Sequence, residues 1–465
     1  MKIKKLVSVL LVLVMVLSSF AACDKKGKET NTDSAQKVED NKETKKEEPT
    51  QAPTEKPTEK PEKVSQGVTD TTIKVGNAAA TSGALAAVGV PFNAGIEAYF
   101  KMVNDAGGVQ GRKLEFVHID DEFDPVKGKA ATETLINDEK VFAIVGHFGT
   151  PTVSATIDLI QEYGAPMVYA ATGINALYFE NSPNNPVMAV QPIYLTDGRI
   201  MTARALGESV YGPNNDQKLA ADAQVGVLYT ADDAGNSIKE GIEMEAEFFN
   251  KKDDFHYEVV TAETVSTAVN KLKNEEVDVI ILAMNQGPFA YSLTALNTAG
   301  LDVPVFTSYV NADISAVDHT KVNESPIFTN AWVDVFTTTG QADAVDFADA
   351  ITKSDLDAET KGKYYTNSFA IAGYIAATIF VEGLERVAKN EEELTFATYI
   401  DAMEEGPINV PMGGTVDFSG GKRWGIASMS LLKYTVTPTE DPNAPTEAFA
   451  KVREIETIEQ IRAKK

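Results

Sequence analysis

Short apolar runs alternate with amphipathic stretches along the chain from residue 67 onward. Residues 72–76 have the pattern of a buried strand, and the residues after them carry apolar side chains at helical spacing: Phe92, Ile96, Tyr99, Phe100 and Val103. The alternation continues with a strand at 114–119, a helix at 125–137, a strand at 141–145, a helix at 151–163 and a strand at 167–169. Strands that alternate with helices predict an α/β fold with a parallel-rich sheet.

The same plan restarts in the second half of the chain. Residues 225–229 predict a strand, and Asp232 and Asp233 supply cap residues for the helix that follows. Further along we expect a helix at 265–274, a strand at 277–283, a helix that stops at Gly300, a strand at 305–309 and a long helix at 364–387. The repetition predicts an α/β protein of two doubly wound lobes.

The N-terminus carries a different pattern. Three lysines precede an apolar run at 6–17, and the small residues Ala21 and Ala22 stand directly before Cys23. A basic start, a short apolar run and small residues predict a secretory signal at 1–22. Cys23 in this place resembles the lipidated residue of a lipoprotein. Residues 24–66 hold almost no apolar side chains, which predicts a solvated tether, or alternatively a plain N-terminal segment without a tether role.

Composition excludes several classes of protein. The net charge of −26 belongs to the folded part, because residues 24–66 hold 10 lysines against 11 acidic residues. An acidic surface repels phosphate backbones, so we expect no nucleic-acid partner. Cys23 is the single cysteine and the four histidines are scattered, so we expect no metal site and no cofactor. The acidic run at 120–125 lacks the glycine of a calcium loop, and the chain has no catalytic motif.

Three loops that follow predicted strands carry small and hydroxyl-bearing residues. In open parallel sheets, ligands bind at the carboxyl ends of the strands. Thr150 is expected to cap a helix whose first residue is Pro151, and this helix start would accept a carboxylate. The candidate residues of the three loops are Ser82, Gly149, Thr150, Ala171, Thr172 and Gly173. The alternative interpretation of each loop is an ordinary cap or turn.

At these residues the chain resembles the leucine/isoleucine/valine-binding protein family, the type I solute-binding proteins of ABC importers. The resemblance extends over about 70–435, and its most specific stretches are 72–89, 104–114, 120–125 and 145–147 with 163–166. It implies two lobes joined by three crossings, near 191–194, 332–337 and 412–416, that close over a small ligand.

The resemblance also implies a set of ligand contacts. An ungapped match places them on Thr150, Ala171 and Gly173 in the first lobe, and a shift of one residue would replace Gly173 by Thr172. In the second lobe they fall on Asn285 and Tyr309. Tyr309 stands where the family presents an acidic side chain to the ligand's ammonium group, and family aromatics are replaced elsewhere by Val88 and Ala234. These differences leave the identity of the ligand open.

Taken together, the sequence predicts a monomeric binding protein that is secreted and anchored by lipid to the outer face of the cell membrane. It would capture an amino acid of branched-chain type, or a related small carboxylate, and deliver it to an ABC permease and its ATPase. A sensor that presents its closed form to a membrane receptor is the alternative, and an enzyme is not expected. The expected parts are a signal at 1–22, a tether at 23–66, lobe 1 at 67–193 with 334–415, lobe 2 at 194–333 with 416–452, and a C-terminal tail at 453–465.

Overall fold

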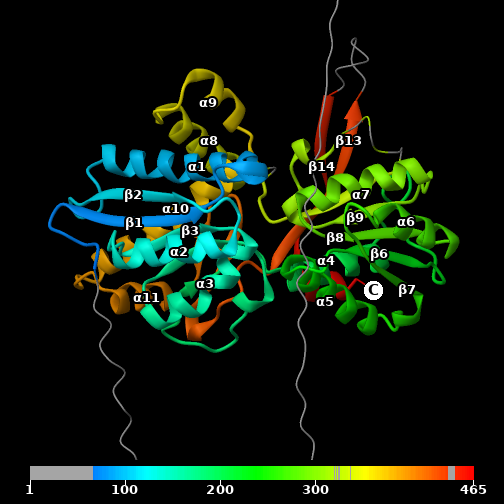
Figure 1. Cartoon of the computed structure of the whole chain (residues 1–465), viewed down its shortest axis with the longest axis horizontal. Coiled ribbons are helices and arrows are strands. Elements are labelled where there is room, and N and C mark those ends of the chain that lie inside the picture. The colour runs from blue at the N-terminus through cyan, green and yellow to red at the C-terminus, as the bar shows by residue number, and fades with distance from the viewer. Residues whose placement is uncertain are drawn as a thin grey trace, which may run out of the picture. The chain divides into compact units, whose positions relative to one another are not determined.

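The computed structural model describes residues 66–464, apart from 319, 321, 323–324, 336 and 438–445 (Figure 1). The predicted signal, Cys23 and nearly all of the predicted tether lie outside the described residues. The described part contains two sheets that carry helices on both faces, so the predicted α/β class and the two doubly wound lobes are confirmed.

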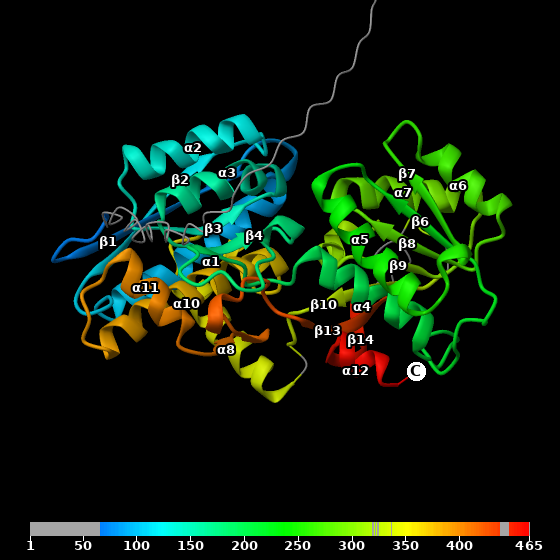
Figure 2. The ribbon, with the colours of Figure 1, turned by 90° about the horizontal axis from the view of Figure 1, so that it is seen from below.

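Lobe 1 is built on a parallel five-stranded sheet with the order β2-β1-β3-β4-β5. Helices α2 and α3 cover one face of the sheet, and α1 and α10 pack against each other on the opposite face (Figure 2). The strands are β1 (Thr72–Ala79), β2 (Lys113–Asp120), β3 (Ala143–Phe148), β4 (Met167–Ala171) and β5 (Val187–Met188). The helices are α1 (Ala86–Asp105), α2 (Pro125–Asn137), α3 (Thr150–Tyr163), α8 (Thr338–Lys353), α9 (Ala358–Tyr364), α10 (Ser368–Lys389) and α11 (Phe396–Glu404).

Lobe 2 is built on a seven-stranded sheet with the order β14-β13-β10-β9-β8-β6-β7, in which β13 runs antiparallel to both of its neighbours. The strands are β6 (Val225–Tyr229), β7 (Phe255–Val259), β8 (Val279–Ala283), β9 (Val305–Thr307), β10 (Ile327–Ala331), β13 (Ser428–Thr437) and β14 (Thr446–Thr457). The helices are α4 (Tyr194–Gly207), α5 (Asp233–Phe248), α6 (Val265–Asn274), α7 (Gln286–Ala299) and α12 (Ile458–Arg462). A small separate sheet pairs β11 (Ile408–Val410) with β12 (Gly414–Val416).

Local sequence signals explain where several elements begin and end. Asp124 caps α2 by accepting hydrogen bonds from the backbone N–H groups of the first turn, and Asp232 caps α5 in the same way. Gly300 ends α7 in the left-handed conformation that glycine adopts without steric cost. The predicted α2, α5, α6 and α7 are therefore confirmed, and Asp232 and Gly300 stand at the start of α5 and the end of α7 as expected.

Helix α10 is the one helix in the described part of the chain with the length and apolar composition of a membrane span. Two thirds of its apolar window lies buried, however, and it packs closely on α1. A side chain at Gly373 would come within 1.8 Å of the carbonyl oxygen of Phe92. Its hydrophobicity is therefore explained by its position in the core of lobe 1.

Some elements differ from the sequence-based expectation. The strand expected at 305–309 ends at Thr307, and Tyr309 begins a short 3-10 helix. The long helix expected at 364–387 begins at Ser368, because Asn367 caps its first turn. Residues 453–462, expected as part of a tail, form the end of β14 and helix α12. The buried Arg204 of α4 holds this region by donating to the carbonyl oxygens of Met429 and Glu454.

Candidate ligand-binding site

The start of α3 and the end of β4 lie side by side at one edge of the lobe 1 sheet. Gly149 caps α3 at φ 97°, and its N–H donates to the carbonyl oxygen of Ala171 over 3.3 Å. The hydroxyl groups of Thr150 and Thr172 are 2.8 Å apart, and both residues are buried. The prediction that Thr150 caps this helix is wrong by one residue, since Thr150 is the first helical residue and Pro151 the second. Its hydroxyl is thereby left to face Thr172.

Tyr194 at the start of α4 links these loops to lobe 2. Its N–H donates to the carbonyl oxygen of Gly173 over 2.5 Å. Its hydroxyl hydrogen-bonds with the threonine pair, Thr150 and Thr172, and lies 3.5 Å from the side-chain oxygen of Asn285. Burial raises the pKa of Tyr194 to about 12, so the phenol stays protonated and can donate. Sequence reasoning placed Tyr194 at a crossing and did not identify it as a site residue.

Tyr309 approaches the same place from lobe 2. Its hydroxyl accepts from the side-chain amide of Gln191 over 2.9 Å and donates to the carbonyl oxygen of Pro192 over 2.7 Å. Its ring centroid lies 6.0 Å from that of Tyr194. Burial raises the pKa of Tyr309, and the hydroxyl remains neutral. Tyr309 is therefore anchored to the segment that leads into α4.

Asp197 in the first turn of α4 supports the backbone at Tyr309. It is fully buried, and its carboxylate accepts from the side-chain amide of Asn330 over 2.8 Å. The hydroxyl of Ser308 and the N–H of Tyr309 also hydrogen-bond to it. Burial outweighs these bonds and raises the pKa of Asp197 to about 6. Asp197 thus fixes the short helix that presents Tyr309.

Seven of the eight predicted site residues therefore lie close together. Thr150, Thr172, Gly173 and Asn285 lie next to Tyr194, and the ring of Tyr309 is near the Tyr194 ring. Gly149 and Ala171 are hydrogen-bonded to each other and adjoin the threonine pair in the chain. Ser82 is the exception, because it is exposed in the loop after β1 and its hydrogen bond is with Asp120. No interaction described for Ser82 joins it to the threonine pair. The sequence pattern of a small, hydroxyl-bearing loop grouped Ser82 with the other residues, and the structure separates it from them.

A cavity of about 570 Å³ adjoins Tyr309 and is lined by residues of both lobes. Its wall is mostly apolar and includes Trp332, Val335, Phe369, Leu432 and Phe449. Asp313 also lines it, and its carboxylate accepts from the hydroxyl of Ser368 at the start of α10 over 2.7 Å. Thr150 and Thr172 do not line this cavity; Tyr309 lines it and also lies near Tyr194, the partner of the threonine pair. The cavity and the threonine pair are the two parts of the candidate ligand-binding site.

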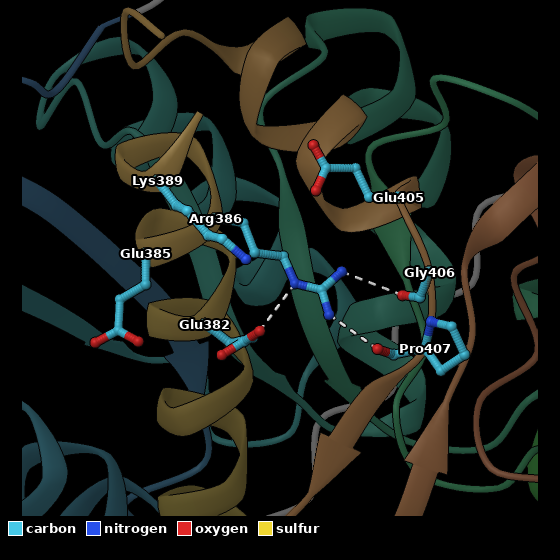
Figure 3. Close-up of a pocket in the computed structure, with 7 residues that line it drawn as sticks. All are labelled: Glu382, Glu385, Arg386, Lys389, Glu405, Gly406 and Pro407. Carbon is cyan, nitrogen blue, oxygen red and sulfur yellow. Dashed lines mark hydrogen bonds and ion pairs between the residues drawn. The ribbon is translucent and has the colours of Figure 1, made fainter. Parts of the chain in front are cut away.

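A second hollow, of about 390 Å³, lies between α10 and the end of α11 in lobe 1 (Figure 3). The guanidinium of Arg386 occupies its centre and donates to Glu382 over 2.9 Å and to the carbonyl oxygens of Gly406 and Pro407 over 3.1 and 2.9 Å. Arg386 also reaches Ala402 near the end of α11. These bonds satisfy the carbonyl of Ala402 in the last turn of α11 and those of two residues just beyond the helix, so this hollow is explained by structure.

The described residues contain no group of three or more histidine, cysteine, aspartate or glutamate side chains able to hold a metal ion. His147 near the end of β3 is fully buried and lies 3.0 Å from the hydroxyl of Thr156. Burial lowers the pKa of His147 to about 3, so the ring is neutral. Its position between α3 and the sheet is that of a core residue.

Comparison with known proteins shows what the chain is similar to. The family model described as periplasmic binding protein matches residues 72–438. A Leu/Ile/Val-binding protein homolog 3 of Brucella melitensis is 24% identical over 78% of this chain and 91% of its own length. A fatty acid ABC transporter substrate-binding protein of Thermomonospora curvata has a TM-score of 0.65 at 22% identity and covers 86% of this chain and 95% of its own. A solute-binding protein of R. palustris in complex with 4-hydroxybenzoate also has a TM-score of 0.65, at 18% identity, over 83% of this chain and 97% of its own.

The chain therefore belongs to the periplasmic binding protein family. Members of this family are extracytoplasmic solute-binding proteins and not enzymes. The resemblance inferred from the sequence is confirmed, and so is the expectation that the chain catalyses no reaction.

Proposed function

We propose that the chain is the extracytoplasmic solute-binding lipoprotein of an ABC importer. It captures an amino acid, of branched-chain type, or a related small carboxylate, and delivers it to a membrane permease and its ATPase. The observation that carries this proposal is the pair of buried threonine hydroxyls, Thr150 and Thr172, connected through Tyr194 to Asn285 of the other lobe. The names of the relatives, which include a Leu/Ile/Val-binding protein homolog, support an amino acid as the first candidate.

The start of α3 supplies the chemistry for a carboxylate. The first N–H groups of a helix have no partner within the helix, and the helix dipole makes this end positive. The N-cap residue of α3 is Gly149, which makes no side-chain cap bond, and Pro151 brings no N–H, so the N–H groups of Thr150 and Thr152 are the donors proposed for the ligand. Thr150 and Thr172 add two hydroxyl donors, and Asn285 and Tyr309 complete the site from lobe 2. Affinity for the closed arrangement then draws the lobes together, without any covalent step.

Closure is expected to reduce the size of the protein in solution. Small-angle scattering of residues 67–465 should give a smaller radius of gyration once a ligand from a thermal-shift screen of amino acids and carboxylic acids is saturating. Such a screen is sensitive, because a ligand at 100 times its dissociation constant adds about 2.7 kcal/mol of stability. A radius that stays the same at saturation would count against closure.

The lipid anchor has its own test. Cys23→Ala in the full chain should release the protein from the membrane fraction, because the proposed acyl chains have no other attachment point. Ser18→Ala, five residues earlier, is the matched control and should leave the protein membrane-bound. Equal membrane association of the Cys23 variant and the parent protein would show that the lipoprotein assignment is wrong.

A sensor that presents its closed form to a membrane receptor is the second candidate function. It uses the same binding site, so the site itself does not distinguish the two. Genes for a permease and an ATPase beside the gene for this chain would favour transport.

A further inference from the structure

The cavity beside Tyr309 has the size and lining of a site for a solute with an apolar body. Its volume of about 570 Å³ lies within the range of roughly 300–1,000 Å³ that is typical of small-molecule sites. Four aromatic rings contribute to its wall: Tyr309, Trp332, Phe369 and Phe449. Phe369 comes from α10 of lobe 1 and Phe449 from β14 of lobe 2, and both are half-buried. A flat ring between these side chains would be enclosed from both lobes.

The charged groups at the cavity already have partners. Asp313 accepts from Ser368, and Lys363 forms an ion pair with Glu359 over 2.8 Å. The remaining lining side chains are mostly apolar. Burial of a charge without a partner is unfavourable, so the part of a ligand that enters this cavity is uncharged.

A second observation comes from Tyr169, which does not line the cavity but packs against Trp332, a residue of its wall. It lies within β4, two residues before Ala171, and has a φ of 63°, which is rare for a bulky residue and costs conformational energy. Its ring centroid is 6.3 Å from that of Trp332, and its hydroxyl is close enough to Tyr309 to affect the pKa of that residue. The Tyr169 side chain is fully buried, and its hydroxyl has no hydrogen-bond partner in the described structure. A buried hydroxyl without a partner is unfavourable, so it points to a bound molecule that supplies one.

We propose that the solute is an aromatic carboxylate, held by its carboxyl group at Thr150 and Thr172 and by its ring in the cavity beside Tyr309. The inference rests on the proposed solute-binding function and specifies its ligand class. Tyr309 joins the two halves of the site, since its ring lies near Tyr194 and also forms part of the cavity wall. The ring stacks among Trp332, Phe369 and Phe449, and the Tyr169 hydroxyl donates to a carboxylate oxygen of the solute.

Calorimetry with 3-phenylpropanoate, L-phenylalanine and L-valine tests the ligand class. At least one of the two aromatic acids should bind 10-fold or more tightly than L-valine. Tighter binding of L-valine would overturn the aromatic assignment and leave the proposed function in place. Binding of none of these probes, nor of any acid in the thermal-shift screen, would overturn both.

Variants then test the placement of the ring. Phe369→Ala should weaken binding of the better aromatic probe about 10-fold, because it removes one stacking partner. Tyr365→Ala, which removes an exposed ring outside the cavity, is the matched control and should leave the affinity unchanged. Phe449→Ala repeats the test from the other lobe if the first variant folds poorly. Equal affinities of the two cavity variants and the control would overturn the placement.

Tyr169→Phe separates a binding role from a structural one. Loss of an unpaired buried hydroxyl should raise the melting temperature of the ligand-free protein, while binding of the aromatic probe should weaken several-fold. A lower melting temperature together with unchanged affinity would show that the hydroxyl serves the fold and not the ligand.

Discussion

Replacement of Arg423 by Met is expected to lower the free energy of unfolding by about 3–5 kcal/mol, because it breaks a buried charge network. The Arg423 side chain is completely buried. Its guanidinium donates to the carbonyl oxygen of Asn185 over 2.8 and 3.1 Å and to that of Lys422 over 2.8 Å, and it pairs with the carboxylate of Glu404. Met fills a similar volume but provides no donor, so these acceptors lose their partner.

Lys422→Met is the matched control for this variant. Lys422 is the neighbouring residue and pairs with Asp417 over 2.6 Å, but its side chain is about one third exposed. Exposed ion pairs contribute roughly 0–1 kcal/mol, so the control should lose no more than this. Urea unfolding at neutral pH measures both variants. If Arg423→Met lowers the free energy of unfolding by less than about 1 kcal/mol, the bonds of Arg423 to Asn185 and Glu404 do not stabilise the packing of residues 417–425 on lobe 1.

The sequence predicted best those features that depend on neighbouring residues. Apolar spacing identified the alternating strands and helices, and Asp232 and Gly300 indicated helix boundaries where the structure has them. By contrast, β14 and α12 were missed, because β14 has no fully buried residue and mixes charged with apolar side chains. Its position depends on contacts with distant residues, such as the donation from Arg204 to Glu454.

For the candidate site, too, the sequence predicted some residues and missed others. Small and hydroxyl-bearing residues after strands predicted that Thr150 and Thr172 lie together, because such loops meet at one edge of a parallel sheet, and their hydroxyls are 2.8 Å apart. Tyr194 and Tyr169 carried no comparable signal. Tyr194 gains its role from three segments that come together only in the fold, and the positive φ of Tyr169 has no sequence cue in a residue other than glycine, asparagine or aspartate. The partner of Asp313 is Ser368, 55 positions away in the chain.

The second large effect is expected at Thr150. A hydrogen bond to a charged group contributes about 1.5–3 kcal/mol, so Thr150→Ala should weaken binding of a carboxylate ligand roughly 10- to 150-fold. The variant also leaves Thr172 without the hydroxyl that lies 2.8 Å away. Thr150→Ser keeps the hydroxyl and removes only a methyl group, so it should retain most of the affinity. The difference between these two variants isolates the hydrogen bond from packing.

Calorimetry of the parent protein, Thr150→Ala and Thr150→Ser tests the central claim most directly. Each is titrated with the tightest-binding acid among L-leucine, L-valine, L-phenylalanine and 3-phenylpropanoate. We expect the Ala variant to bind at least 10-fold more weakly than both the parent protein and the Ser variant, with all three unfolding at similar temperatures in the absence of ligand. Equal affinities of all three proteins would contradict a ligand carboxylate held at the start of α3.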